Sequence, residues 1–523
     1  MKYLLALACI TGMAYQMHAQ SFVRTELPTE VNRPWEITYG PDDYLWLTEK
    51  DGKVIRVHPE TGAKTVVFTA SDYFDGSPLE DLDACTNPSI GKGTLGLALD
   101  PDFTNPDYAF IYYVYSYNSG TSSFPSTKFR IKRLKWDANT ATVVADTNLV
   151  DSLANGHAHQ GGRLLAVKYA NTSFLYLSIG DHGISELSSP ECYIPQSTNP
   201  NNFAQDVTTQ NGKIHRFNID GSIPFDNPIA GNSFYTRGHR NPQGLMYNPS
   251  LGLVYDIEHG DFADDEINIL YKGMNYGWKD VRGYHDDETI QGEADYVANY
   301  VPHPNIANDS LVEAFYSWCT DVDTTDPTNN SLWCTVAPSG GAYYGSDAIP
   351  EWSNSLLVVT LKDGLTVDRE VYQFRLTEGG ELALSTENHP NPTKFFGEDQ
   401  ALNGRLRDIA ISNDGKKIFL VSNAGIEEDK ITVYTYDPDT GIGENDKDAI
   451  IVYPNPVKDI LYFSELDKIN NFKSLQITDI SGKLLFQQNE PSSSLAVNHL
   501  APGVYIVKLI SGNSIQSIRF VKQ

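Results

Sequence analysis

One pattern recurs six times along the 523 residues: a strand, a short turn, and a second strand rich in Leu, Val and aromatic residues. Several copies continue into further strands, so that one unit has room for four strands. A recurring four-strand unit of this kind is typical of β-propeller blades with insertions. Two β-sandwiches would explain the strands but not the sixfold recurrence. We therefore predict a six-bladed β-propeller, whose copies begin at Trp35, Leu95, Arg163, Gly244, Gly341 and Asp408.

The composition agrees with an all-β fold and limits the partners. The chain has 30 Tyr and 22 Phe beside 40 Gly and 28 Pro, a mixture that favours short strands and turns over long helices. It carries 39 Lys and Arg against 67 Asp and Glu, a net charge of −28. Nucleic acid is therefore not an expected partner. Any anionic ligand needs a local cationic pocket that is built against the field of the whole protein.

The pattern changes near residue 440. Residues 440–449 form a polar linker, and residues 450–523 contain short strands and tight turns, enough for a small β-sandwich. This stretch starts with Tyr453-Pro454-Asn455-Pro456, has Pro502-Gly503-Val504-Tyr505 near its end, and thereby resembles the C-terminal sorting domain of type IX secretion. The resemblance implies the type IX machinery as a partner, and surface attachment or release as the destination. A carbohydrate-binding or spacer module is the alternative.

The N-terminus resembles a secretory signal. Residues 1–19 contain Lys2, an apolar run and a small residue, Ala19, before Gln20. Cys9 weakly imitates a lipoprotein cleavage site, which is the alternative reading. No later stretch approaches the ~18 apolar residues of a membrane span. The propeller is accordingly assigned to residues 20–439 of an exported protein.

Four cysteines remain after the signal: Cys85, Cys192, Cys319 and Cys334. An even number in an exported protein suggests disulfides. Cys319 and Cys334 bracket a polar loop and are the favoured pair, whereas Cys85 with Cys192 follows only by elimination. The chain has no CxxC motif and no clustered His, so we do not expect a zinc site.

Two neighbouring segments could carry chemistry. The loop of residues 238–244 offers Arg240 and Asn241 where propeller loops line a central channel, although a surface turn with a solvated Arg is the simpler reading. Further on, Asp264, Asp265 and Glu266 repel one another unless a hard cation lies among them. Calcium takes carboxylate and carbonyl oxygens, which suits such a turn. A solvated acidic loop is the alternative.

Together with residues 272–278 and 283–287, these segments resemble the soluble pyrroloquinoline-quinone (PQQ)-dependent glucose dehydrogenases, within the glucose/sorbosone dehydrogenases. The similarity covers roughly residues 30–437 and is densest over about 212–287. The resemblance implies a six-bladed propeller with PQQ over the channel mouth and a sugar substrate. It also allows a homodimer, for which the sequence shows no interface.

The resemblance implies a general base, His159, in the run Ala158-His159-Gln160-Gly161-Gly162-Arg163-Leu164. An imidazole suits this role because its ordinary pKa of about 6.5 lies near working pH. Asp181 matches a channel-facing carboxylate that would fix the tautomer of His159. The implied reaction moves the anomeric hydrogen of an aldose to PQQ as hydride, while Arg240 and calcium stabilise charge on oxygen. A lactone results, and an external acceptor takes the electrons.

The cofactor has three carboxylates, and the family-matching positions supply four cations: Arg240, Lys362, Arg405 and Arg407. Arg405 and Arg407 are two residues apart and would share one face of a strand. By the same mapping, Asn241 and Thr335 contact the cofactor, and the backbone carbonyls of Gly260 and Asp261 hold the active-site calcium. The positions that match a structural calcium site are Glu266, Tyr276, Tyr284 and Asp286.

The chain departs from the family at positions that face substrate. The Asp expected before the base is Ala158, and the expected sugar-contacting Gln is Gly91 or Lys92. His182 and Glu186 stand where glucose enzymes carry Gln. We therefore expect a PQQ enzyme with altered sugar preference, for which glucose itself is doubtful. Two other readings are a non-catalytic propeller that binds glycans or proteins and a calcium-dependent lactonase. The retained base and cations speak against both.

Overall fold

The computed structural model describes residues 22–74, 93–120, 127–156, 158–182, 202–261, 263–286, 292–318, 335–362, 367–386, 390–423, 429–438, 452–463, 472–479, 483–490, 492–511 and 514–523. The predicted signal segment 1–19, the linker 440–449 and all four cysteines of the expected disulfides lie outside these residues. Within them, no helix combines the length and the apolar character that a membrane span requires.

Six four-stranded sheets follow one another along the chain. The first two contain β2 (Pro34–Tyr39), β3 (Leu45–Glu49), β4 (Lys53–Val57) and β5 (Lys64–Thr69), then β6 (Thr94–Leu99), β7 (Phe110–Asn118), β8 (Thr127–Asp137) and β9 (Thr142–Leu153). The third and fourth contain β10 (Leu164–Tyr169), β11 (Thr172–Ile179), β12 (Lys213–Asn218) and β13 (Phe234–Arg237), then β14 (Pro242–Asn248), β15 (Leu253–Glu258), β16 (Asp265–Ile269) and β17 (Tyr316–Trp318). The last two contain β18 (Pro338–Tyr344), β19 (Ser355–Thr360), β20 (Val371–Arg375) and β21 (Thr393–Phe395), then β22 (Leu406–Ile411), β23 (Lys417–Ser422), β24 (Ile431–Tyr436) and β1 (Phe22–Glu26).

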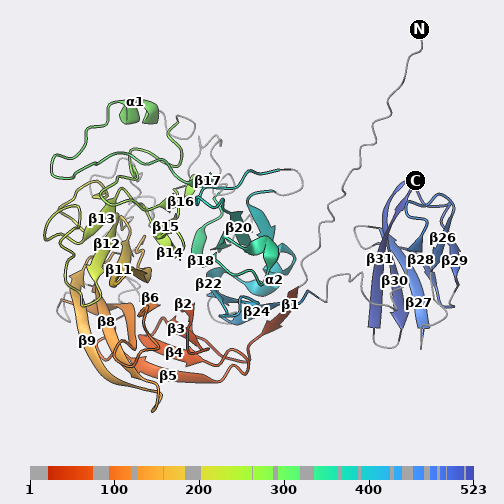
Figure 1. Cartoon of the computed structure of the whole chain (residues 1–523), viewed down its shortest axis with the longest axis horizontal. Helices are drawn as coiled ribbons and strands as arrows, with labels where there is room; N and C mark the ends of the chain where they lie inside the picture. Colours follow the sequence, from red (N-terminus) through yellow and green to blue (C-terminus); the bar gives the residue numbers. More distant parts are fainter. Residues whose placement is uncertain are drawn as a thin grey trace, which may run out of the picture. The chain divides into compact units, whose positions relative to one another are not determined.

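The sheets are arranged as a closed ring (Figure 1). The first strand of each sheet contacts the first strand of the next, and β22 of the last sheet contacts β2 of the first. The N-terminal strand β1 pairs with β24, so the two ends of the propeller chain share the sixth blade. The prediction of a six-bladed propeller is confirmed, and each predicted strand pair forms the two inner strands of one blade.

The apolar cores lie between neighbouring blades. One cluster joins the first and second blades through Trp46, Val54, Leu97 and Tyr113. Others join the third blade to the fourth and the fourth to the fifth. The alternating apolar residues of each strand therefore fill both faces of a blade. This packing explains why these strands are rich in Leu, Val and Tyr.

A buried ion group ties three blades together near the inner strands. The guanidinium of Arg163 lies 2.5 Å from Glu36 of β2 and 2.8 Å from Asp408 of β22. Asp408 also accepts a hydrogen bond from the backbone N–H of Ile37 at 2.9 Å. Because Arg163 directly precedes β10, the group links the first, third and sixth blades.

The chain divides into two compact units, one of residues 23–435 and one that holds residues 436–523. The second unit has two sheets around its own apolar core, which includes Val457, Leu475, Val507 and Phe520. One sheet contains β25 (Val452–Tyr453), β26 (Ile460–Phe463) and β29 (Ser494–Ala496), and the other β28 (Leu484–Gln488), β27 (Phe472–Asp479), β30 (Gly503–Ser511) and β31 (Ser514–Lys522). In the part of the chain that the structure describes, helix is confined to short pieces of the propeller, α1 (Glu293–Ala298) and α2 (Gln400–Asn403) among them.

Candidate active site

An imidazole–carboxylate pair lies at the inner end of the third blade. Nδ1 of His159 is 2.7 Å from Oδ1 of Asp181, and both residues are buried. His159 precedes β10, and Asp181 follows β11 after a single residue, Gly180. A Cβ on Gly180 would lie 2.0 Å from the His159 carbonyl oxygen and 2.8 Å from that of Arg240. Only glycine allows these two loops to meet here. The structure thus brings the predicted base and its partner together.

Asp181 is held from several sides. Its second carboxylate oxygen accepts hydrogen bonds from Nε1 of Trp278 at 2.7 Å and from Nδ2 of Asn202 at 3.0 Å. Its backbone N–H donates to the Arg240 carbonyl at 2.8 Å. An ionised carboxylate can only accept hydrogen bonds, so the proton between the pair lies on Nδ1 of His159. The basic nitrogen of the neutral ring is then Nε2.

Arg240 and Asn241 lie between β13 and β14, on the loop predicted to reach the channel. The buried Arg240 guanidinium donates to the His259 carbonyl at 3.2 Å and lies 3.5 Å from the Asp261 carboxylate. The side-chain carbonyl of Asn241 accepts from Nε2 of Gln243 at 2.7 Å. Arg240 therefore contacts the segment predicted to provide calcium ligands.

The other three predicted cations arrive from the fifth and sixth blades. Arg407 donates to Oε1 of Gln243 at 2.8 Å, which places it beside the Arg240 loop. Arg405 donates to the Leu361 carbonyl at 3.2 Å and so lies beside Lys362. Burial lowers the pKa of Lys362 below its ordinary value.

The pKa of His259 reflects the charged groups around it. Burial and, after it, repulsion from Arg240, Arg407 and His159 together lower its pKa to about 3. The predicted base and two of the four predicted cations therefore lie near one half-buried, neutral imidazole, and they come from the third, fourth and sixth blades.

A cavity of about 380 Å³ opens beside Arg405 and Arg407. Among the described residues its lining has four cations and no carboxylate, in a chain of net charge −28. Burial and the neighbouring Arg405 and Arg163 lower the pKa of Arg407 to about 9. Within the described residues the Arg407 guanidinium pairs with no carboxylate, and its Nε has no hydrogen-bond partner. The cavity is lined by Arg33, Trp35, Lys50, Gly93, Thr94, Leu95, Gln160, Arg405, Arg407 and Asn423.

Asp265 connects two predicted binding segments, a role that the sequence did not reveal. Its carboxylate accepts from the backbone N–H of Gly260 at 2.9 Å, of Val336 at 2.6 Å and of Ala337 at 2.9 Å. Burial raises its pKa to about 6, against the effect of these donors. The loop of Gly260 and Asp261 is thereby fixed against the segment that starts at Thr335. Thr335 itself is buried.

The structure brings only some of the four predicted structural calcium residues close together. Glu266 accepts from the Gly283 N–H at 2.6 Å, so it lies against the turn that carries Tyr284 and Asp286. The Tyr284 hydroxyl accepts from the Ser317 N–H at 3.3 Å. In contrast, the Tyr276 hydroxyl donates to the Ile269 carbonyl at 2.5 Å and closes a neighbouring turn. The assignment of these four residues to calcium stays a prediction.

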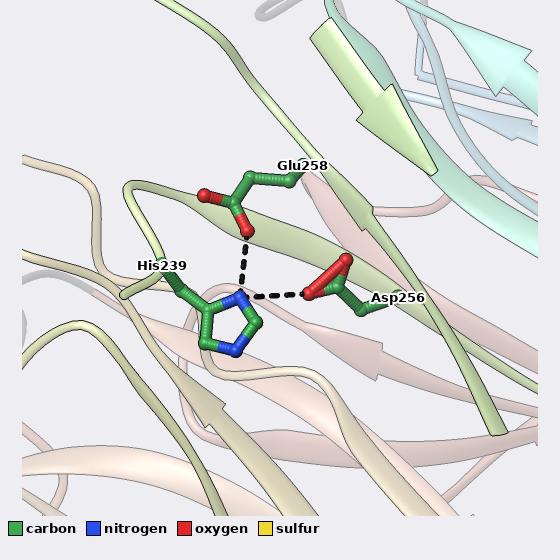
Figure 2. Close-up of side chains that lie close together, drawn as sticks. All are labelled: His239, Asp256 and Glu258. Atoms are coloured by element: carbon green, nitrogen blue, oxygen red, sulfur yellow. Dashed lines mark hydrogen bonds and ion pairs between the residues drawn. The ribbon is translucent and has the colours of Figure 1, made fainter. Parts of the chain in front are cut away.

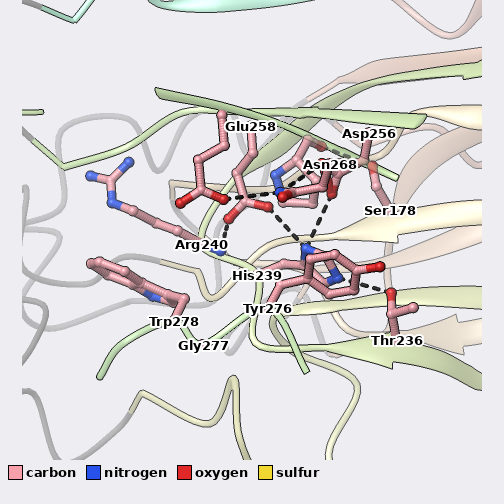
Figure 3. Close-up of polar contacts among 12 residues, drawn as sticks. Ser178, Thr236, His239, Arg240, Asp256, Glu258, Asn268, Tyr276, Gly277 and Trp278 are labelled. Carbon is pink, nitrogen blue, oxygen red and sulfur yellow. Dashed lines mark hydrogen bonds and ion pairs between the residues drawn. The ribbon is translucent and has the colours of Figure 1, made fainter. Parts of the chain in front are cut away.

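A buried group that sequence reasoning missed lies beneath the Arg240 loop (Figures 2 and 3). Nδ1 of His239 is 2.9 Å from Glu258 and 3.1 Å from Asp256, the two carboxylates that β15 turns to this face. Burial alone would lower the pKa of His239, but hydrogen bonds and attraction to Asp256 and Glu258 prevail and raise it to about 9. Glu258 also accepts from the Arg240 backbone N–H. The ligand atoms of the three side chains lie within 4.8 Å of one another, and the protonated imidazole already supplies a cation to this group.

Trp278 is the second residue that the sequence did not single out. Its indole ring lies below the Arg240 side chain (Figure 3), 5.6 Å from the Arg240 guanidinium carbon and 5.3 Å from that of Arg282. Both arginines also contact the Asp261 carboxylate. The same tryptophan therefore contacts the Asp181 carboxylate and the Arg240 cation.

A propeller with a buried base, its carboxylate and an arginine-lined cavity at one face has the features of an enzyme that acts on a polar ligand. Comparison with known families identifies the class of enzyme. The model of the family described as Glucose / Sorbosone dehydrogenase matches residues 31–428, and the chain belongs to this family. It is accordingly a sugar dehydrogenase, an oxidoreductase.

Several relatives are similar over most of their length. Quinoprotein glucose dehydrogenase B of Acinetobacter calcoaceticus is 30% identical over 77% of this chain and 86% of its own. Aldose sugar dehydrogenase YliI of Escherichia coli is 25% identical over 82% and 98% of the two chains. Among solved structures, the PQQ-bound aldose sugar dehydrogenase of Streptomyces coelicolor has a TM-score of 0.54 at 22% identity and covers 80% of this chain and 100% of its own. That last likeness supports the fold.

The C-terminal unit has a match of its own. A family model described as a secretion system C-terminal sorting domain matches residues 451–523. The predicted sorting domain is confirmed, and it directs the protein through type IX secretion to the cell surface or the extracellular space.

Proposed function

We propose that the protein is a PQQ- and calcium-dependent dehydrogenase that oxidises an aldose, or a related sugar, at the anomeric carbon to the lactone. The observation that carries this proposal is that the His159–Asp181 pair contacts the Arg240 loop, whose Gln243 accepts a hydrogen bond from Arg407. The relative named as a quinoprotein and the PQQ-bound neighbour support the same cofactor.

The residues present fit a trianionic cofactor. Holding the half-buried Arg407 guanidinium without a carboxylate is costly, and its buried Nε lacks a partner among the described residues. A carboxylate ligand would supply both the charge and the acceptor. Arginine offers a planar set of donors that suits carboxylates, and lysine offers a point charge. Arg240, Lys362, Arg405 and Arg407 would hold the three carboxylates of PQQ, with Asn241 and Thr335 as further contacts.

The loop of Gly260 fits a hard cation. A Cβ on Gly260 would lie 1.9 Å from the Ala263 carbonyl oxygen and 2.5 Å from that of Asp264, so carbonyl oxygens crowd this turn. Calcium prefers such oxygen ligands. The carbonyls of Gly260 and Asp261 would hold the active-site ion, and Glu266, Tyr276, Tyr284 and Asp286 a structural one.

The protein side of the reaction follows from the pair. When bound, PQQ supplies the oxidant that accepts hydride from the anomeric carbon. Nε2 of His159 accepts the proton of the anomeric hydroxyl, because Asp181 keeps the other ring proton on Nδ1. Asp181 also stabilises the imidazolium that forms. Arg240 stabilises the negative charge that develops on the sugar oxygen.

The preferred sugar substrate should differ from glucose. Ala158 and His182 lie next to the catalytic pair, at positions where the glucose enzymes carry other residues. Burial lowers the pKa of His182 to about 4, so this side chain is a neutral imidazole at working pH. A buried imidazole beside the pair would recognise a different set of hydroxyl groups from the amide of Gln.

The proposal is tested with the full exported chain. The protein is titrated with PQQ in the presence of calcium and is assayed for dye reduction across a panel of aldoses. We expect stoichiometric binding of PQQ and turnover of at least one aldose. Failure to bind PQQ would overturn the proposal. Binding without turnover of any sugar would favour a propeller that has kept the cofactor for another role.

A further inference from the structure

The Asp181 carboxylate is fixed by more than its contact with the base. Its Oδ1 atom faces Nδ1 of His159 at 2.7 Å, and its Oδ2 atom accepts from Trp278 at 2.7 Å and from Asn202 at 3.0 Å. The Asp181 side chain has no solvent exposure. A buried carboxylate that accepts from N–H donors on both oxygens has a defined plane and stays ionised.

Trp278 is itself held by the Arg240 loop. Its backbone N–H donates to the Gly238 carbonyl at 3.0 Å, and its carbonyl accepts from Nε2 of Gln205 at 2.7 Å. Its ring face carries the Arg240 guanidinium, with 5.6 Å between the guanidinium carbon and the ring centroid. A guanidinium over an indole face is an attractive arrangement. Movement of Trp278 would therefore displace both Asp181 and Arg240.

We propose that Trp278 is a positioning residue of the reaction, whose indole N–H orients Asp181 and thereby His159, and whose ring places Arg240. This inference rests on the proposed function, because it assigns a role within that site. Asn202 assists through the same carboxylate oxygen. The pair and Arg240 are thus set by one rigid side chain from a third loop. A misplacement of about 1 Å at such a site can cost up to about 100-fold in rate.

The test uses Trp278→Phe, which keeps an aromatic ring for Arg240 and removes the N–H. The matched control is Trp46→Phe, because the buried Trp46 also donates its indole N–H to a carboxylate, that of Asp42 at 3.1 Å, in the first blade. We expect Trp278→Phe to bind PQQ as the wild type does and to lose kcat by about 10- to 100-fold with little change in KM. Trp46→Phe should keep the wild-type kcat.

The pH profile separates orientation from packing. Without the indole donor, Asp181 attracts the protonated His159 ring more strongly, so the acid limb of kcat/KM should move up by about 0.5 to 1 pH unit. Among the described residues, the charged or titratable side chains around the pair include His182, His259, Arg240 and Lys128. Burial is the main cause that lowers the pKa of His182 to about 4 and that of His259 to about 3, so both imidazoles are neutral above pH 5. The acid limb of the kcat/KM profile therefore reports on His159.

A second measurement is independent of turnover. Histidine labelled with ¹⁵N gives the titration midpoint of His159 by NMR, with its signal assigned by its absence in His159→Gln. We expect a higher midpoint in Trp278→Phe, and a smaller rise in Asn202→Ala, which provides the test if Trp278→Phe does not fold. An unchanged midpoint, or a parallel loss of PQQ affinity and kcat with an unmoved pH profile, would overturn the inference. If the wild-type protein oxidises no sugar, the proposed function is refuted. The NMR midpoints would still show whether Trp278 orients the His159–Asp181 pair.

Discussion

Replacing Arg407 by Gln should weaken cofactor binding and stabilise the cofactor-free protein, two effects of opposite sign. Arg407 lies half-buried beside Arg405 and Arg163 and has no carboxylate partner among the described residues; desolvation and these two neighbouring cations lower its pKa from the ordinary value to about 9. A pKa difference of one corresponds to about 1.4 kcal/mol, so the free-energy cost of keeping the Arg407 guanidinium charged is several kcal/mol at most. Glutamine removes the charge and can keep one hydrogen bond to Gln243 or Ser339.

We expect the free energy of unfolding of the cofactor-free Arg407→Gln protein to rise by up to about 1–2 kcal/mol, since removing a partly buried ion that has no carboxylate partner is stabilising. Loss of a charge-assisted hydrogen bond to a PQQ carboxylate should cost about 1.5–3 kcal/mol of binding, a 10- to 150-fold higher Kd. The assays are urea unfolding of the propeller and titration of PQQ with calcium, followed by tryptophan fluorescence.

Arg163→Gln is the matched control for Arg407→Gln. Arg163 is more deeply buried than Arg407 and lies 2.5 Å from Glu36 and 2.8 Å from Asp408, so removing it leaves two carboxylates without their cation. We expect this variant to lose about 3–5 kcal/mol of stability. The reasoning is refuted if Arg407→Gln binds PQQ with wild-type affinity, or if its cofactor-free form is less stable than the wild type.

His159→Gln should bind PQQ with an affinity within about twofold of the wild type and lose at least about 100-fold in kcat, because only proton transfer is removed; a parallel loss of both in the titration and the dye assay would make His159 structural. The pKa of His239 is raised from 6.5 to about 9, so its stabilising contribution is complete below pH 6.5 and is lost as pH rises through about 9. Urea midpoints should therefore fall between pH 6.5 and 9 in the wild type and change less in His239→Gln, and equal pH dependence would contradict this. A chelator should lower the Tm of the wild type by several degrees and that of Glu266→Gln by less, because calcium binds only the folded state; calorimetry that shows equal losses would remove Glu266 from the metal site.

The fold was largely predictable because each blade repeats one physical pattern. Strands such as β3 and β11 alternate apolar residues between two neighbouring blades. The closing strand β1 was not predictable, because residues 22–26 alternate little and become a strand only beside β24.

The site was predictable where a side chain belongs to a recognisable run, as for His159, Arg240 and Arg407. The supporting residues were not, because their roles depend on loops that are distant in the chain. Trp278 reaches Asp181 across 97 positions, and Asp265 reaches Val336 across 71. The acidic run of Asp264 to Glu266 looked like one cation site, but strand alternation sends Asp265 and Glu266 to different partners.

We propose that this acidic propeller gathers arginines and a lysine at one face to bind a triply charged redox cofactor. The decisive experiment is calorimetric titration of PQQ into the full calcium-loaded chain at rising NaCl concentration. We expect one equivalent to bind, with an affinity that falls as salt increases. A flat heat trace at every salt concentration, or binding that salt leaves unchanged, would overturn the proposal.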